Sequence, residues 1–261
     1  MAIPKIIHYC WFGGNPMPKI LRYCVNSWKQ LLPEYEFMFW NENNTTFDCE
    51  FIKTAYSQKK WAFVSDYVRL KAVCDHGGIY MDTDMLLLKS LDDFLNNECF
   101  FVAEHPKSIN ASIFGAMPNN GFIGLCLETY RKEDAALLPI PTIVSIIFLK
   151  KYKLERKFKE TIVLKDIVIY APDYFYCLPY NKLFDIHNYK KYLTKNSYGV
   201  HLWHGSWHSY NELVLLRRKE YSKAFTKILN TIFKKKKFGF LYVKKVMVAF
   251  KDSLVTPNAF K

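Results

Sequence analysis

The chain has 261 residues, half of them hydrophobic, so it can bury one large core or two small ones. Its net charge is +13, and residues 211–261 hold +10 of it, with thirteen Lys or Arg against three Asp or Glu. The seven cysteines form no CxxC pair and have no regular spacing, which argues against a disulfide framework or a zinc site. Because no apolar run reaches about 18 residues, we expect a cytoplasmic protein, in the cytosol or on the cytosolic face of a membrane.

The first third of the chain alternates between strand and helix patterns. Short apolar and aromatic runs predict strands over 3–11, 35–40 and 79–88, and helical spacing predicts helices over 18–31 and 61–76. Gly77 and Gly78 should end the second helix, since glycine readily takes the left-handed cap conformation. Strands that alternate with helices favour parallel pairing, so the sequence predicts an α/β sheet.

Weaker patterns cover the rest of the chain. They predict strands over 99–103, 111–117, 162–170 and 198–203, and helices over 121–131, 142–152 and 211–233. We therefore expect a catalytic domain over residues 1–210 and a basic, helical C-terminal segment over 211–261.

Two acids lie inside the apolar segment 79–88. Asp82 and Asp84 are two residues apart, so on an extended chain their carboxylates point the same way. For an isolated Asp-x-Asp, a solvated loop is the more common explanation. Carboxylates among apolar residues are costly unless paired or bound to metal, however, and together they suit Mg²⁺ or Mn²⁺. Such a cation would offset the charge on a departing nucleoside diphosphate.

Asp66 and Arg69 lie three residues apart in the predicted helix 61–76, hence on one face of it. An arginine suits a phosphate or a sugar, and a carboxylate accepts hydrogen bonds from sugar hydroxyls. The alternative interpretation is an ordinary ion pair on a helix surface.

Three stretches together resemble glycosyltransferase family 32, which includes capsular polysaccharide enzymes, yeast mannosyltransferases and inositolphosphoceramide mannosyltransferases. The stretches are IPKIIHYCWFGG from Ile3, SDYVRL from Ser65 with GGIYMDTD from Gly77, and HLWHGSW from His201. The second of them also looks like the glucosyltransferase domain of large clostridial toxins, which use a non-His ligand in the region of the third. Each stretch is weak alone, but together they span residues 3–207.

The resemblance implies a GT-A type, Rossmann-like nucleotide-sugar-binding sheet with flanking helices. It also implies a divalent metal and retention of the anomeric configuration. The implied roles fall on residues that match the motifs. Trp11 would stack on the donor base, Asp66 and Arg69 would hold the donor sugar, Tyr80 would belong to the donor site, and Asp82 and Asp84 would bind metal and phosphates. His201, with His204 as its competitor, would be a late metal ligand, and Ser206 and Trp207 would touch the diphosphate.

The resemblance therefore predicts a retaining glycosyltransferase that acts on a UDP- or GDP-linked sugar, in capsule or surface polysaccharide synthesis. No catalytic nucleophile stands out in the sequence. Glu104 and Asn110, which follow a predicted strand, are candidates for the acceptor side, with plain loop polarity as the alternative. A non-catalytic nucleotide-sugar or glycan-binding module is the second hypothesis, although such a copy would be free to lose Asp82 or Asp84.

The basic segment 211–261 mixes apolar residues with Lys and Arg at spacings of three and four. Helices of this type lie on anionic membrane surfaces. The sequence thus predicts a peripheral protein on the inner face of the cell membrane. The resemblance implies a glycan or lipid-linked oligosaccharide acceptor, the latter if the chain builds a capsule or surface polysaccharide. A core helix with a solvated tail is the alternative. A nucleic-acid binder is a further one, but no nucleic-acid motif accompanies the charge.

Overall fold

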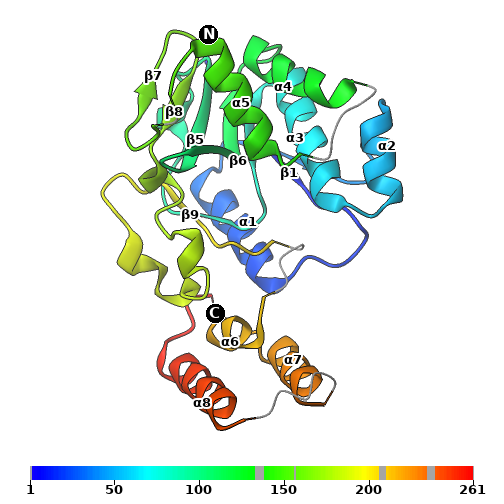
Figure 1. Cartoon of the computed structure of the whole chain (residues 1–261). Coiled ribbons are helices and arrows are strands. Elements are labelled where there is room, and N and C mark those ends of the chain that lie inside the picture. The colour runs from blue at the N-terminus through cyan, green and yellow to red at the C-terminus, as the bar shows by residue number, and fades with distance from the viewer. Residues whose placement is uncertain (1, 133–137, 156, 206–209, 234–238, 261) are drawn as a thin grey trace. The chain divides into compact units, whose positions relative to one another are not determined.

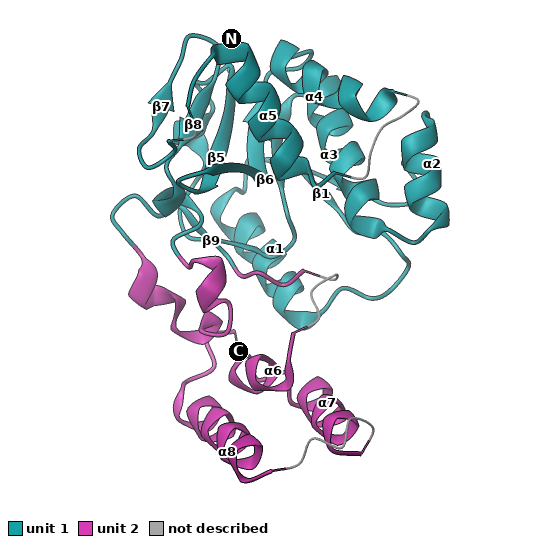
Figure 2. Cartoon of the chain, in the orientation of Figure 1, with its two compact units in different colours: residues 1–177, 194–201 teal, residues 178–193, 202–261 magenta. Residues whose placement is uncertain are grey.

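The computed structural model describes residues 2–132, 138–155, 157–205, 210–233 and 239–260. The chain forms two compact units (Figure 2), the first made of Met1–Cys177 and Thr194–His201, the second of Leu178–Leu193 and Leu202–Lys261. These units divide the chain differently from the predicted boundary at residue 210. The difference arises because the chain leaves the first unit at Leu178 and returns to it to add one last strand.

The first unit is built on a seven-stranded mixed sheet with the order β2-β1-β3-β6-β5-β8-β7 (Figure 1). Its strands are β1 (Ile6–Cys10), β2 (Glu36–Trp40), β3 (Gly78–Met81), β5 (Cys99–His105), β6 (Ser108–Ala116), β7 (Ile162–Val163) and β8 (Val168–Tyr170). Strand β1 pairs in parallel with both β2 and β3, as the alternation of strands and helices predicts. Beyond β3 the pairing becomes antiparallel to β6. The predicted α/β fold class is confirmed.

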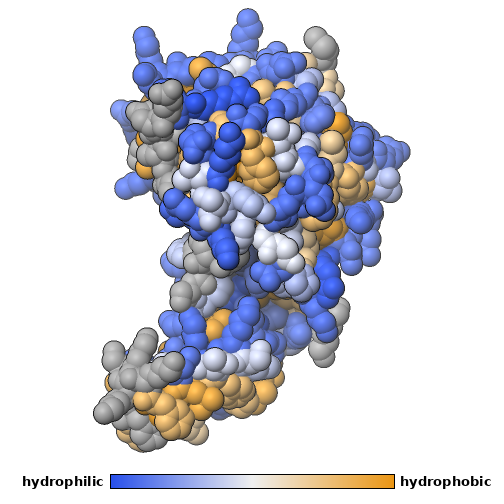
Figure 3. Space-filling model, turned by 90° about the vertical axis from the view of Figure 1, so that its right-hand side faces the viewer, coloured by the Kyte–Doolittle hydropathy of each residue, from blue (hydrophilic) through white to orange (hydrophobic). Residues whose placement is uncertain are grey.

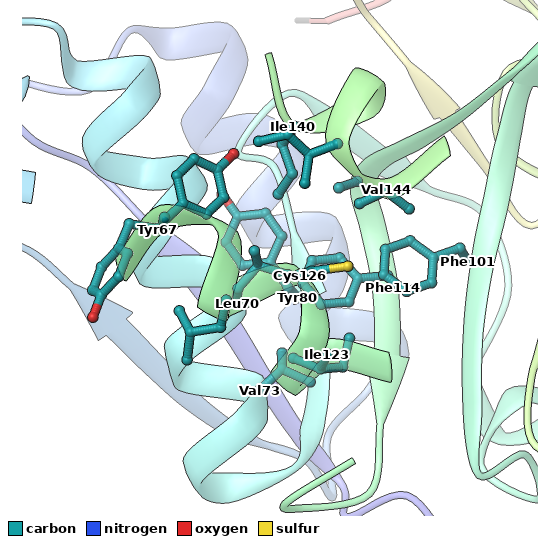
Figure 4. Close-up of a cluster of buried hydrophobic side chains, with 14 of the residues drawn as sticks. Tyr67, Leu70, Val73, Tyr80, Phe101, Phe114, Ile123, Cys126, Ile140 and Val144 are labelled. Carbon is teal, nitrogen blue, oxygen red and sulfur yellow. The ribbon is translucent and has the colours of Figure 1, made fainter. Parts of the chain in front are cut away.

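The described residues of the first unit form five helices. They are α1 (Lys19–Leu31), α2 (Glu50–Ser57), α3 (Trp61–His76), α4 (Gly121–Arg131) and α5 (Ile140–Tyr152), with short 3₁₀ turns η1 (Asp92–Phe94) and η2 (Pro172–Tyr174). Apolar residues of α2 to α5 share one buried cluster with residues of the sheet, including Tyr80, Phe101 and Phe114 (Figure 4). This cluster fixes α3 against the sheet and thereby places its polar residues.

The turn between α3 and β3 requires glycine. Gly77 has φ +65° and Gly78 φ +99°, and a Cβ on Gly77 would lie 2.7 Å from Pro118 Cδ. Both the backbone conformation and the close packing exclude a side chain. Gly77 ends α3 as predicted, but its ψ of −168° lies outside the predicted left-handed cap conformation. The turn leads the chain directly from α3 into the central strand.

The predicted strand 79–88 is wrong, because the structure divides it between two sheets. Strand β3 ends at Met81, and β4 (Met85–Leu87) pairs antiparallel with β9 (Gly199–His201) in a separate two-stranded sheet. A tight turn separates the two strands, with the Met85 amide donating to the Asp82 carbonyl at 3.0 Å. Because both strands are buried, the residues on either side of the acids are apolar. The sequence therefore reads as one continuous strand and gives no sign of the break.

The second unit is helical, with α6 (Glu212–Arg217), α7 (Tyr221–Phe233), α8 (Phe240–Val255), and 3₁₀ segments η3 (Tyr180–Lys182) and η4 (Ile186–Tyr192). The single helix predicted over 211–233 is interrupted at Lys219, which has φ +60°. Leu215, Leu216, Ala224 and Ala249 form a small core shared by α6, α7 and α8.

Candidate functional site

Asp82 and Asp84 lie at the carboxyl end of the central strand β3. The Asp82 amide still pairs with the Ser112 carbonyl of β6 at 2.7 Å, so the first acid is anchored to the sheet edge. The side chain of Asp82 is 19% exposed and that of Asp84 is 9% exposed. Both acids and His201 offer ligand atoms that lie within 4.8 Å of one another.

His201 reaches this group through the second sheet. Met85, the first residue of β4, pairs with His201, the last residue of β9, and His201 Nε2 lies 3.2 Å from Asp84 Oδ1. Burial lowers the pKa of His201, but the Asp84 carboxylate, helped by Asp82 and Glu104, outweighs it and the net direction is upward. His204 lies 3.9 Å from Glu220 in the second unit. Of the two candidate histidines, His201 therefore accompanies the carboxylates.

Arg69 is buried beside this group, with 3% of its surface exposed. Its Nη2 lies 3.2 Å from both Asp66 Oδ1 and Asp82 Oδ1. Its Nη1 donates to the Ala111 carbonyl at 2.9 Å, and its Nε donates to the Ser65 carbonyl at 3.2 Å. All three guanidinium nitrogens are thus engaged by the protein. In the structure Arg69 contacts the Asp82 carboxylate, and its contact with the donor sugar or phosphate stays a prediction.

Tyr80 supports the same carboxylate from the strand. Its hydroxyl donates to Asp82 Oδ1 at 2.8 Å, and its ring centre lies 4.6 Å from the Arg69 guanidinium carbon. Since Tyr80 is only 1% exposed, the structure gives it the acid and the arginine as neighbours rather than an open donor surface. Ser65, whose hydroxyl lies 3.1 Å from both the Tyr80 hydroxyl and Arg69 Nη2, is a member of the site that the sequence did not single out.

Asp66 is 7% exposed and accepts a hydrogen bond from the Ile140 amide at 3.3 Å. Burial raises the pKa of its carboxyl from 3.8 to about 6, although Arg69 acts in the opposite sense. A carboxylate in so apolar a place is retained in ionised form chiefly by the arginine beside it.

Trp11 follows the carboxyl end of β1, the parallel neighbour of β3, so it lies at the same sheet edge as Asp82. Its Nε1 donates to the Asn15 carbonyl at 2.6 Å. The intervening Gly13 has φ +95°, and a Cβ there would lie 2.8 Å from the Trp61 ring. Ligands of α/β sheets bind at this edge, where strands end and loops begin.

Glu104 and Asn110, the acceptor-side candidates, lie on β5 and β6 and bond to each other, with Asn110 Nδ2 donating to Glu104 Oε2 at 2.7 Å. Asn110 Oδ1 also accepts from the Ser112 amide at 2.9 Å. The charge of Glu104 also contributes to the raised pKa of His201. Ser206 and Trp207, the two predicted diphosphate contacts, lie outside the described residues.

Comparison with known proteins agrees with this site. Residues 18–101 match the family model described as a glycosyltransferase sugar-binding region containing a DXD motif, in which Asp82-Thr83-Asp84 is the motif. An uncharacterised glycosyltransferase of Acanthamoeba polyphaga mimivirus is 30% identical over 51% of this chain and 59% of its own. The chain is therefore similar to glycosyltransferases with a DXD-containing sugar-binding region, in agreement with its resemblance to family 32.

Two further similarities are more distant. Inositol phosphoceramide mannosyltransferase 3 of Schizosaccharomyces pombe is 29% identical over 47% of this chain and 35% of its own. Among solved structures, the PaToxG glycosyltransferase aligns with 58% of this chain and 71% of its own, at a TM-score of 0.47 and 15% identity. The chain thus aligns with between about a third and three fifths of the length of these two curated relatives.

Proposed function

We propose that the chain is a metal-dependent glycosyltransferase that moves a sugar from a nucleoside diphosphate, UDP or GDP, to a glycan acceptor. The observation that carries this proposal is the meeting of Asp82, Asp84 and His201 at the carboxyl edge of the sheet. Trp11 lies at the same edge, where it can stack on the base of the donor.

The three side chains fit a divalent cation by their chemistry. Two carboxylates supply the oxygen ligands that Mg²⁺ and Mn²⁺ prefer, and an imidazole favours Mn²⁺ over Mg²⁺. When bound, the cation would offset the negative charge that develops on the leaving diphosphate. Arg69 and Tyr80 hold the Asp82 carboxylate in place before any ligand arrives, so the site is preorganised.

Retention of configuration is part of the proposal, on the strength of the family resemblance. In a front-face reaction, the acceptor oxygen bonds to the anomeric carbon as the bond to the diphosphate oxygen breaks, and the acceptor proton passes to the departing phosphate. No protein base is needed for this, which agrees with the absence of an evident nucleophile in the sequence. Proton NMR of the first product tests it, since a β-linked product from an α-linked donor would exclude retention.

The acceptor we propose is a lipid-linked glycan of a capsule or surface polysaccharide, reached from the cytoplasm. One relative supports a lipid acceptor, because its name assigns it inositol phosphoceramide. The proposed role in capsule or surface polysaccharide synthesis is based only on the resemblance to family 32.

A panel of nucleotide sugars with Mn²⁺, scored for hydrolysis without acceptor, tests the activity. Hydrolysis of one donor that is lost in Asp82→Asn supports the enzyme. The competing hypothesis, a non-catalytic module, predicts donor binding by calorimetry with no hydrolysis and no transfer to any acceptor glycan.

A further inference from the structure

Helices α7 and α8 expose large apolar side chains that their own unit leaves uncovered. Figure 3 shows hydrophobic side chains gathered over the helices of this unit. We call these residues the apolar face: Phe225, Leu229 and Phe233 of α7, with Phe240, Leu241, Met247, Val248, Leu254 and Val255 of α8. Their exposed fractions run from 46% to 86%. Soluble domains scatter such residues singly, whereas a contiguous group indicates a binding surface.

The orientation of α8 is the reverse of an ordinary surface helix. Its small residues Ala249 and Ser253 are the buried ones. Ala249 belongs to the core shared with α6 and α7, and the Ser253 hydroxyl accepts from the Tyr221 hydroxyl of α7 at 3.2 Å. The larger Met247 and Leu254 point outward and are 66% and 64% exposed. A helix that served only to cover a core would turn its large apolar residues inward.

Lysines share this outward face of α8. Phe240, Lys244, Met247, Lys251 and Leu254 follow one another at spacings of four and three, which places them on a single stripe, and all five are exposed. Lysine stems can lie along an apolar surface while the ammonium reaches a charged layer above it. The stripe therefore presents exposed apolar side chains together with lysine ammonium groups that can extend beyond them.

The α7 stripe joins this face. Phe225, Leu229 and Phe233 are spaced four residues apart on the side of α7 away from the buried Ala224 and Thr231. The ring of Phe225 lies 6.3 Å from that of Phe250 on α8, so the exposed residues of the two helices meet.

Charge is concentrated in the same unit. By sequence, residues 178–193 and 202–261 hold sixteen Lys or Arg against four Asp or Glu, a net charge of +12 out of +13 for the chain. The first unit is consequently near neutral. A cationic unit with an apolar face complements a surface that is both anionic and apolar below its charges.

We propose that the apolar face of α7 and α8 docks on an anionic phospholipid membrane, with Lys244 and Lys251 at the level of the headgroups. Two copies of the face would bring together two units of charge +12, and repulsion opposes that pairing. Nucleic acid would use the charge but leave the apolar residues in water. None of the helices that the structure describes is long and apolar enough to cross a membrane. The helices accordingly lie in the interface plane.

The proposal goes beyond the catalytic one and stands apart from it, since docking needs no turnover. The test is co-sedimentation of the full chain with vesicles of phosphatidylglycerol and phosphatidylcholine, compared with phosphatidylcholine alone. We expect strong binding to the anionic vesicles, little to the neutral ones, and weakening as salt rises, because the Debye length is about 8 Å at physiological ionic strength.

Three double variants make the test specific. Met247→Ser with Leu254→Ser should weaken anionic-vesicle binding at least tenfold, and Lys244→Gln with Lys251→Gln should weaken it several-fold and flatten its salt dependence. The matched control, Val163→Ser with Ile146→Ser, removes apolar residues of similar exposure from the first unit and should bind like the unchanged chain. Hydrolysis of a soluble donor without vesicles should be the same in all of them, so failure of docking and failure of catalysis are distinguishable.

Several results would overturn the proposal. The first is an intact chain that ignores anionic vesicles or binds neutral ones equally well. The second is binding by the Met247 and Leu254 variant that matches the control. The third is a dimer, seen by light scattering, that this variant dissolves, since the face would then bind a second copy.

Discussion

Arg69 grips the Asp82 carboxylate with both terminal nitrogens, Nη2 at 3.2 Å from Oδ1 and Nη1 at 3.4 Å from Oδ2. A two-pronged contact of this kind fixes the plane of a carboxylate as well as its position. The arginine itself is held by carbonyls of α3 and β6, so the orientation of Asp82 is set by the packing of helix against sheet.

Replacing Arg69 by lysine should therefore weaken metal binding while keeping the charge. A lysine ammonium is a point charge and cannot hold both carboxylate oxygens in one plane. We expect Mn²⁺ affinity to fall roughly 10- to 100-fold, the range typical of groups that orient a metal ligand. Calorimetric titration with Mn²⁺ measures this, and Arg131→Lys, which changes an exposed ion pair with Glu128, is the control. Unchanged Mn²⁺ affinity with weakened donor binding would instead favour direct contact of Arg69 with the donor.

Asp82→Asn and Asp84→Asn should each abolish turnover without unfolding the chain. An amide has the shape of a carboxylate but not the charge that a divalent cation requires. EDTA should have the same effect on the unchanged chain, and added Mn²⁺ should reverse it. Asp75→Asn, on the exposed side of α3, should stay fully active. Activity that survives either site variant or chelation contradicts the metal role.

Much of the fold follows from local signals in the sequence. The predicted helix 121–131 matches α4 because Asn120 caps it, accepting from the Phe122 and Ile123 amides, and its apolar spacing is regular. The helix 61–76 matches α3 because Gly77 ends it. Where caps and periodicity agree, neighbouring residues alone determine the element.

The features that the sequence did not predict are those that depend on contacts between residues far apart in the chain. The break between β3 and β4 depends on the pairing of Met85–Leu87 with Gly199–His201, which lie more than a hundred residues further along the chain. The hold of Arg69 on Asp82 likewise needs α3 packed on the sheet. Spacing along α3 predicts only the ion pair with Asp66. The family resemblance supplied His201, which the sequence pattern alone does not distinguish from His204.

Trp11→Ala should weaken binding of the nucleoside diphosphate by about 1–3 kcal/mol, the scale of stacking between a base and an aromatic ring. Trp11→Phe keeps a ring and should recover most of that loss. Calorimetry with the free nucleoside diphosphate measures both variants. If alanine and phenylalanine weaken binding equally, the loss comes from the Nε1 hydrogen bond to Asn15, and the ring does not stack on the base.

His8 lies fully buried in β1 and is held from both sides of its ring. Its Nε2 pairs with the Gly77 carbonyl at 2.7 Å, and its Nδ1 accepts from Trp40 Nε1 at 3.1 Å. Acceptance at Nδ1 requires a neutral ring. Burial lowers the pKa of His8 from 6.5 to about 4, so the folded chain keeps this ring neutral well below the pH at which the unfolded chain protonates it.

Stability should therefore fall as the solution is acidified through the unfolded pKa of 6.5. Between the two pKa values the unfolded chain binds a proton that the folded chain does not, so its free energy drops with falling pH. From pH 7 to pH 5 this removes ~2 kcal/mol from the free energy of unfolding. Asp66 titrates in the opposite sense, because its folded pKa is raised. The contribution of His8 must therefore be obtained by comparing the unchanged chain with a His8 variant.

Urea unfolding of the unchanged chain and of His8→Gln at both pH values isolates the contribution of His8. The variant should have the lower free energy of unfolding at pH 7. The difference from the unchanged chain should be smaller by ~2 kcal/mol at pH 5. His105→Gln, an exposed histidine of the same sheet, should track the unchanged chain. A deficit that stays constant with pH would mean that His8 protonates equally in the folded and unfolded chains.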